Sequence, residues 1–250
     1  MARSVLGDIA IALAFFTRLP FPPPDIRDRT LGEAIWAAPV AGLTVALLGA
    51  LAFTICDALG MTSALAAAFA LAVVMAATGC LHEDGLADTA DAFGGGHTVE
   101  RKLEIMHDSL IGTYGAAALI CSLLLRWAAL ASLTAGADVI CALIAAHVAS
   151  RGIFGVLIQR TPLARDSGLA ASVGQVSGEA SAAGLVIAGV ALLFLGIGGA
   201  ILAGFCAAAA VYGFRALAIR QIGGVTGDTL GAAQQVAEVT ILALASAMLS

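Results

Sequence analysis

The chain has 250 residues, of which 60% are hydrophobic and only 12% are charged. Its mean hydropathy is +1.00. Soluble domains carry roughly a quarter charged residues, so this composition excludes a water-exposed globule and favours a protein that lies in a membrane. The formal net charge of -5, with 12 basic residues, leaves no basic patch, and we therefore expect no nucleic-acid partner.

The apolar residues form long runs without a period of two, which favours membrane helices over a lipid-facing β-barrel. In chain order, the segment 4–17 is short, contains Asp8, and either crosses marginally or lies in the interface. The run 182–214 is too long for one crossing, and Gly196, Gly198 and Gly199 predict two short spans joined by a tight turn. The remaining predicted spans are 35–56, 61–80, 112–133, 138–159 and 232–249. The sequence therefore predicts an all-α, polytopic integral membrane bundle with seven or eight spans.

The basic residues decide the expected orientation of this bundle. The intervening connections near 57–60, 134–137 and 197–199 contain none of them. Nine of the 12 fall in alternate connections: Arg18, Arg27, Arg29, Arg101, Lys102, Arg160, Arg165, Arg215 and Arg220. Because positively charged connections stay in the cytoplasm, we predict that four connections are cytoplasmic: 18–34, 81–111, 160–181 and 215–231.

One of these connections concentrates the titratable residues of the chain. It holds seven carboxylates and three histidines: His82, Glu83, Asp84, Asp88, Asp91, His97, Glu100, Glu104, His107 and Asp108. Asp84, Asp88 and Asp91 are spaced i, i+4, i+7, so on a helix they share one face, where their repulsion is unfavourable without a cation. A solvated, charge-rich connection is the plainer interpretation. Hard oxygen ligands without cysteine favour Mg²⁺ or Mn²⁺ over zinc.

Two glycine-rich segments suggest that a phosphate binds nearby. The segment 93–96 ends in three glycines, which let backbone amides approach a phosphate closely, although an ordinary helix terminus has the same pattern. The segment 223–231 combines glycines, hydroxyls and Asp228 on the same predicted side of the membrane. A turn followed by a helix cap is the alternative for this second segment.

Several charged residues lie at or inside predicted spans. Arg18 is a candidate for phosphate contact, although an arginine at a span boundary is more often a lipid-headgroup anchor. Arg126, His147 and Arg151 lie within spans, where charge is unfavourable, so they are functional candidates. Snorkelling toward the nearer cytoplasmic side is a simpler explanation for Arg151, whereas Arg126 lies in the middle of its span.

The longest motifs of the chain are residues 79–95, 101–115 and 224–231, and further matching positions are Thr17-Arg18-Leu19-Pro20, Pro39, Gly42 and Glu238. In these motifs the chain resembles the cobalamin synthase family, whose members are also called adenosylcobinamide-GDP ribazoletransferases. The residues that depart from the family's usual pattern are Glu83, His107 and Leu110, and these departures leave the acidic core intact.

The resemblance implies a Mg²⁺-dependent enzyme of the bacterial cytoplasmic (inner) membrane, formed by residues 1–250 as a single catalytic domain with its active site on the cytoplasmic side. It implies transfer of the adenosylcobinamide-phosphate moiety from adenosylcobinamide-GDP to α-ribazole or its 5'-phosphate. The ribazole 3'-hydroxyl attacks the phosphorus on the cobinamide side, and GMP leaves. We also expect the protein to contact membrane lipid. The sequence does not fix the oligomeric state, and a homo-oligomer is compatible with it.

Residue types and resemblance together give three sets of candidates. The candidate catalytic residues are His82, Asp84, Asp88 and Asp91, and as the base we favour a carboxylate over His82. The candidate metal ligands are Glu83, Asp84, Asp88, Asp91, Glu104, Asp108 and Asp228. The candidate substrate-binding residues are Arg18, Gly94, Gly95, Ser109, Arg151, Thr226 and Gly227.

Two other functions fit parts of the pattern. A CDP-alcohol phosphotransferase also places spaced aspartates in a membrane bundle, but its signature Asp-Gly-x-x-Ala-Arg is not completed after Asp84-Gly85, because Asp88 follows Ala87 where that signature has alanine. A divalent cation transporter would gather carboxylates near the bilayer midplane on broken spans, whereas here they lie in a predicted connection.

Overall fold

The computed structural model describes residues 5–20, 29–133 and 136–249, and within these ranges every regular element is helical. The single isolated β-bridge among them joins Leu163 to Val225. The all-α prediction is therefore confirmed. The helices are α1 (Val5–Phe16), α2 (Leu31–Ala34), η1 (Ile35–Ala37), α3 (Ala38–Ala58), α4 (Ser63–Thr78), α5 (Leu81–Gly95), α6 (Val99–Ile105), α7 (Thr113–Ala131), α8 (Gly136–Gly152), α9 (Phe154–Arg160), α10 (Leu169–Ser172), α11 (Gly178–Leu192), η2 (Leu193–Leu195), α12 (Gly196–Ile222) and α13 (Gly227–Leu249).

Five helical segments of the described chain are long and apolar enough to cross a membrane: Leu31–Ala58, Thr113–Ala131, Gly136–Arg160, Gly178–Ile222 and Gly227–Leu249. The helices α4 and α5 qualify as a sixth segment only as a pair, which is bent by 88°. The 45-residue segment is divided at Gly196, whose φ of +74° ends η2 before α12 begins, close to the predicted break. The number of crossings, seven or eight, stays a prediction.

Large apolar side chains face outward from the helices that form the outside of the bundle. They include Leu47 and Leu51 on α3, Ile120 on α7, Val186 on α11 and Phe205 on α12, all about half exposed or more. Large apolar side chains exposed in this number are expected where lipid replaces water. The helix α8 is the most enclosed of the membrane helices and packs against α3, α11 and α13.

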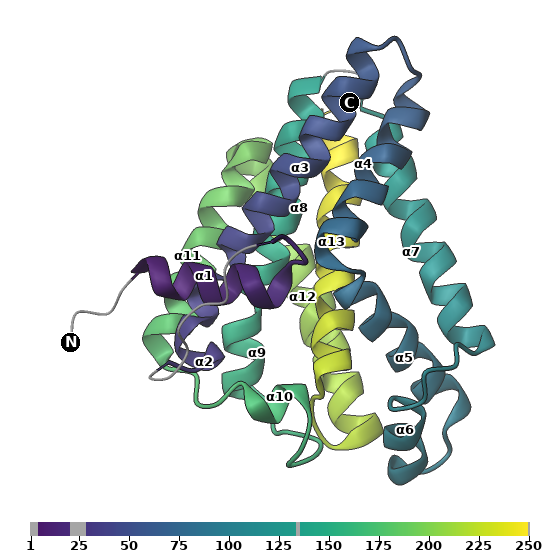
Figure 1. Cartoon of the computed structure of the whole chain (residues 1–250), viewed down its shortest axis with the longest axis vertical. Coiled ribbons are helices and arrows are strands. Elements are labelled where there is room, and N and C mark those ends of the chain that lie inside the picture. The colour runs from purple at the N-terminus through teal and green to yellow at the C-terminus, as the bar shows by residue number, and fades with distance from the viewer. Residues whose placement is uncertain (1–4, 21–28, 134–135, 250) are drawn as a thin grey trace.

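Several connections lie at two opposite ends of the bundle (Figure 1). The helices α6 and α10 and the turn between α12 and α13 lie at one end, whereas the turn between α3 and α4 and the C-terminus lie at the other. The connections that hold Lys102, Arg165 and Arg220 therefore share one end, as the basic residues predict. Arg27 belongs to the same prediction but lies outside the described residues.

A sharp corner separates the apolar helix α4 from the polar helix α5. Gly79 and Cys80 both adopt left-handed backbone conformations, with φ of +63° and +57°. The chain after α1 supports this corner, because the backbone N–H of Arg18 donates to the carbonyl of Ala77 over 2.7 Å. The corner directs α5 across α13 and α7, so the acidic residues of α5 lie beside the start of α13.

Candidate active site

The helices α5 and α13 cross so closely that small residues are needed at the contact. A Cβ atom built on Gly85 would lie 2.6 Å from the carbonyl oxygen of Asp228, which is too short for any side chain. Across the same contact, a Cβ on Gly231 would lie 3.4 Å from the Cα of His82. This crossing joins the two polar segments of the sequence, so Asp84 and Asp228 come to the same place.

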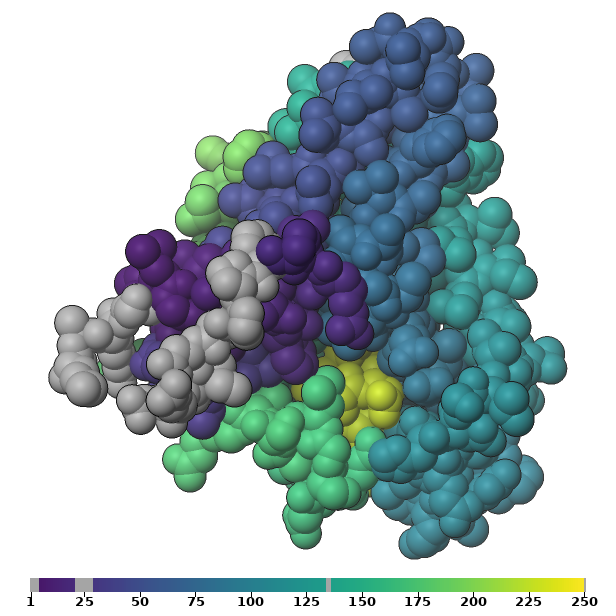
Figure 2. Space-filling view, in the orientation of Figure 1, coloured from purple at the N-terminus to yellow at the C-terminus, as the bar shows by residue number. Residues whose placement is uncertain are grey.

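These residues line an open cleft of about 520 Å³. In Figure 2, a patch of α13 is visible at the surface between the segments 81–115 and 160–175. The N-terminal elements of the chain border the same patch. The helix α5 forms one wall, and the connection between α6 and α7 forms another with Ser109, Leu110 and Ile111. The titratable residues that line the cleft are Cys80, Glu83, Asp84, Asp88, His107, Asp108 and Asp228.

Negative charge is crowded at this cleft. Asp88 is half-buried on α5, which is too polar to count as a membrane span without α4. Burial, together with the neighbouring carboxylates of Asp84, Asp228 and Asp91, raises the pKa of Asp88 to about 7. A bound cation would relieve this repulsion.

A basic side chain reaches the cleft from another connection. Arg165 Nη2 lies 3.7 Å from Asp228 Oδ2, and the same guanidinium contacts the imidazole of His107. The β-bridge holds it there, because the N–H of Val225 donates to the carbonyl of Pro162 and the N–H of Ala164 donates to the carbonyl of Val225. From the sequence alone, Arg165 indicates only the side of the membrane on which its connection lies. Nothing in its sequence neighbourhood distinguishes it from the other basic residues.

Asp91 and Thr226 hold helix ends rather than line the cleft. The Asp91 carboxylate accepts the backbone N–H groups of Gly112 and Gly115 over 2.7 and 2.8 Å, at the start of α7. A carboxylate in this position is stabilised by the positive end of the helix dipole. Thr226 accepts the backbone N–H of Thr229 over 3.2 Å and so caps α13. The simple capping interpretation of the second polar segment therefore applies to Thr226.

Other predicted site residues lie outside the cleft. Glu104 is exposed on α6 and pairs with Arg101 over 2.9 Å. Gly94 and Gly95 form the C-terminal end of α5, the negative end of its dipole, and a Cβ on Gly94 would collide with the ring of Tyr114. Arg18 is exposed beside the corner at Gly79. Gly227 does not line the cleft but faces Leu169.

Arg151 does not face the cleft either, because it belongs to a buried polar cluster. Its side chain is 1% exposed, so the predicted snorkelling toward the membrane surface is wrong. Arg151 Nη1 lies 3.7 Å from Glu238 Oε2, and His147 Nδ1 lies 2.9 Å from the same oxygen. Gln234 also donates to Glu238, over 2.6 Å. Arg151 therefore contributes to the interior of the bundle.

Arg126 extends this cluster toward the cleft. It is fully buried and lies 2.9 Å from Glu83 and 3.1 Å from Glu238. Glu83 is the residue shared by the cluster and the cleft, so its carboxylate already has a cationic partner. The sequence identified Arg126 and His147 as unusual, but only the structure brings Glu238 between them.

His82 lies on the other side of α5 from the cleft. Its ring is 2% exposed and stacks beside the rings of Phe16 and Phe154. Burial lowers the pKa of His82 well below its ordinary value, so its imidazole is neutral. Because His82 does not line the cleft, its placement favours a carboxylate as the base.

The residues of the cleft fit a magnesium ion of the usual kind. Among the described residues, no group of three His, Cys, Asp or Glu side chains is arranged to hold a metal by itself. Mg²⁺, however, commonly binds through one or two carboxylates and completes its shell with water and substrate phosphates. Asp84 and Asp88, crowded with Asp228, supply such carboxylates.

Residues 8–246 match the family described as cobalamin-5-phosphate synthase. The chain is 52% identical over 248 residues to the adenosylcobinamide-GDP ribazoletransferase of Mesorhizobium japonicum, covering 99% of this chain and 96% of that protein. It is 48% identical over 247 residues to the protein of the same name from Bradyrhizobium diazoefficiens, covering 98% and 95%. No solved structure matches the chain. Because these matches include nearly every residue, the chain belongs to the cobalamin-5-phosphate synthase family.

Proposed function

We propose that this protein is an adenosylcobinamide-GDP ribazoletransferase that joins adenosylcobinamide-GDP to α-ribazole or α-ribazole 5'-phosphate and releases GMP. The proposal follows the names of relatives that match nearly the whole chain. The structural observation that carries it is the single cleft in which carboxylates from α5 and α13 meet the guanidinium of Arg165. A transfer from a diphosphate needs both kinds of charge in one place.

Mg²⁺ is the cofactor that this cleft suits best. Asp84 and Asp88 would hold it, with Asp228 directly beside them. When bound, the ion supplies charge neutralisation for the diphosphate. Glu83 is a weaker candidate ligand because Arg126 already neutralises its carboxylate. Asp108 lines the cleft from the opposite wall and remains a candidate, whereas Glu104 and Asp91 have other roles.

The residues of the cleft then have separate tasks in the transfer. The acceptor 3'-hydroxyl oxygen forms a bond to the cobinamide-side phosphorus, while the bond from that phosphorus to the bridging oxygen breaks and GMP departs with its electron pair. The hydroxyl proton passes to a carboxylate of the cleft. Arg165 and His107 lie where they can contact the phosphates, and a guanidinium stabilises the negative charge that develops on a leaving phosphate.

We further propose that the protein lies in the bacterial inner membrane with the cleft open to the cytoplasm. The helices with outward apolar side chains support the membrane assignment. The common end of the connections that contain Lys102, Arg165 and Arg220 supports the orientation, since basic connections remain cytoplasmic. The substrates are small molecules, and lipid surrounds the apolar helices.

The alternatives are less well supported. A CDP-alcohol phosphotransferase is disfavoured because the match to the cobalamin-5-phosphate synthase family covers residues 8–246. A cation transporter is disfavoured by the same match, and by the names of the relatives, which describe a transferase. The test supplies purified protein in detergent with Mg²⁺ and either adenosylcobinamide-GDP plus α-ribazole 5'-phosphate or a CDP-activated lipid alcohol. We expect GMP from the first mixture, and CMP from the second without GMP from the first would overturn the proposal.

A further inference from the structure

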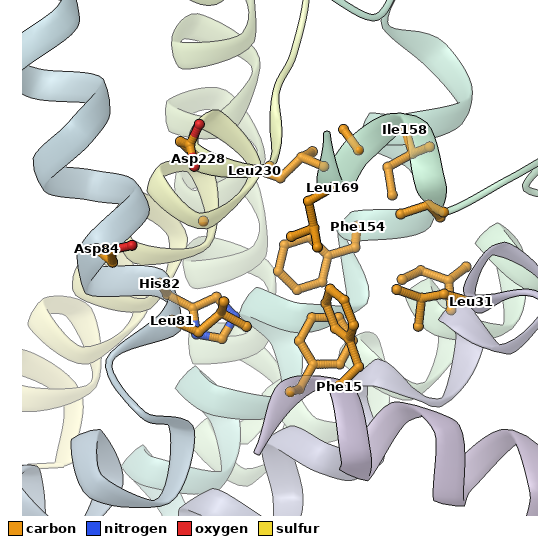
Figure 3. Close-up of a pocket in the computed structure, with 16 residues that line it drawn as sticks. Phe15, Leu31, Leu81, His82, Asp84, Phe154, Ile158, Leu169, Asp228 and Leu230 are labelled. Carbon is orange, nitrogen blue, oxygen red and sulfur yellow. The ribbon is translucent and has the colours of Figure 1, made fainter. Parts of the chain in front are cut away.

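A second, smaller cavity lies beside the acidic cleft and shares two residues with it. Asp84 and Asp228 line both spaces. The second cavity encloses about 80 Å³, and its remaining walls are aromatic and aliphatic. Figure 3 shows Asp84 and Asp228 on one side of this cavity, with Phe15 and Leu31 on the other. A ligand in the cavity would therefore have one apolar end and one end beside the carboxylates.

Three flat rings with nearly parallel planes line the cavity. The rings of Phe16 and Phe154 are inclined by 9°, with centroids 5.2 Å apart. The imidazole of His82 is inclined by 7° to Phe16 and by 14° to Phe154, with centroids 6.1 and 5.9 Å away. Since aromatic rings prefer offset-parallel or edge contacts, such walls favour a planar aromatic ligand over a flexible chain.

His82 lines this cavity and carries an unused polar atom. Its Nε2 atom is buried and has no hydrogen-bond partner among the described residues. Leaving a buried polar atom unpaired costs about 1–3 kcal/mol, so a ligand atom that pairs with it gains specificity. Because an imidazole nitrogen donates or accepts according to its tautomer, a ring nitrogen of a heteroaromatic base is a suitable partner.

We propose that this cavity binds the base of the acceptor nucleoside, an apolar base of the benzimidazole type, with a ring nitrogen paired to His82. The inference rests on the proposed function and assigns one of its two substrates to a place. Guanine fits less well, because its carbonyl, amino and N–H groups would meet side chains that, beyond His82, Asp84 and Asp228, are apolar. A site that leaves such groups unpaired discriminates strongly against them.

The size of the cavity sets the orientation of the base. An apolar cavity of about 150 Å³ holds benzene, so 80 Å³ encloses only one edge of a bicyclic base. The opposite edge, which carries the sugar, then projects toward Asp84 and Asp228. The ribose hydroxyls lie on the side of the acidic cleft, which is where the proposed transfer requires the attacking oxygen.

The test fills the cavity from a wall residue. Ala170 is buried in this wall, so Ala170→Phe should exclude the base and raise KM for α-ribazole 5'-phosphate at least tenfold. KM for adenosylcobinamide-GDP should change less than threefold, which also shows that the variant folds. The matched control is Ala182→Phe, the same change at an exposed position of α11. An unchanged KM for the nucleoside, or a raised KM only for the corrinoid nucleotide, would overturn the assignment.

A second variant separates a binding role of His82 from a role as base. His82→Phe keeps a flat ring but removes Nε2, so we expect a higher KM for α-ribazole 5'-phosphate with kcat within threefold. A kcat reduced a hundredfold at unchanged KM contradicts the proposal. Equilibrium dialysis with α-ribazole alone gives an independent reading, because binding should be lost in Ala170→Phe. If wild-type protein releases no GMP, the proposed function fails, whereas GMP release with undiminished binding in Ala170→Phe overturns the cavity assignment alone.

Discussion

Arg126 Nη1 lies 2.9 Å from Glu83 Oε1 inside the bundle and joins α7 to the first turn of α5. The same guanidinium reaches Glu238 on α13 at 3.1 Å. All three side chains are buried, so this contact ties together the three helices that surround the cleft. The setting of α5, and with it the position of Asp84, therefore depends on a charge deep in the protein.

Arg126→Met should destabilise the protein by about 3–5 kcal/mol, because it leaves the Glu83 carboxylate buried without its cation. Unfolding of the purified protein in detergent measures this effect. The double variant Arg126→Met with Glu83→Leu should recover part of the loss, since replacing a buried pair by apolar residues is often nearly neutral. The control is Arg101→Met, whose exposed partner Glu104 contributes at most about 1 kcal/mol. Equal stability of the two arginine variants would contradict the assignment.

Asp88→Asn should reduce turnover at least a hundredfold while the protein still folds and inserts. The change keeps the size of the side chain but removes a charge from the group proposed to hold Mg²⁺. GMP release across a magnesium titration is the measurement. Glu104→Gln provides the control, because Glu104 lies outside the cleft and its loss should leave the titration unchanged. The same magnesium dependence in Asp88→Asn as in wild type would remove Asp88 from the metal site.

Arg165→Met should raise KM for adenosylcobinamide-GDP about tenfold or more, because a hydrogen bond to a charged group contributes about 1.5–3 kcal/mol. Steady-state kinetics with each substrate varied in turn tests this. Arg220→Met is the control, since Arg220 is exposed at the same end of the bundle and does not line the cleft. If both variants bind the diphosphate substrate as well as wild type does, Arg165 serves only to neutralise Asp228.

Single cysteines placed beside Lys102 and Arg220, in a background without the five native cysteines, should resist an impermeant thiol reagent added to intact cells. The physical reason is the retention of basic connections in the cytoplasm. A cysteine in place of Gly60, in the turn between α3 and α4 at the opposite end, should react and serves as the positive control. Labelling of the first two positions from outside shows that the orientation is inverted.

The fold class followed from composition and pattern together. A chain with so few charges can satisfy its backbone in lipid only as helices or as a closed barrel, and long apolar runs without a period of two argue against the barrel. The convergence of the two polar segments also followed from their common predicted side. The sequence pattern did not distinguish the carboxylates that line the cleft from those that hold helix ends. Asp88 and Asp91 look equivalent by spacing, and their roles differ because the amides of Gly112 and Gly115 meet only Asp91.

The positions of Arg165 and of the polar cluster around Glu238 could be found only from the structure. The place of Arg165 depends on a β-bridge of residues distant in the chain, and no local periodicity encodes such a pairing. Arg126, His147 and Arg151 were conspicuous as charges in apolar runs. Their pairing with Glu238 was not predictable, because the spacing of residues does not show which charges on α7, α8 and α13 face one another.

The number of residues in the corner at Gly79 and Cys80 matters to the cleft as much as the identity of the acidic residues does. Successive residues of a helix are rotated by about 100°, so one residue added or removed at the corner would turn the whole of α5 by that angle. Gly85 would no longer face Asp228, and a bulkier neighbour would meet α13 in its place. All the carboxylates would still be present in the sequence, yet they would point toward different surroundings. The acidic cleft therefore depends on the exact number of residues between α4 and α5, as well as on which acidic residues α5 contains.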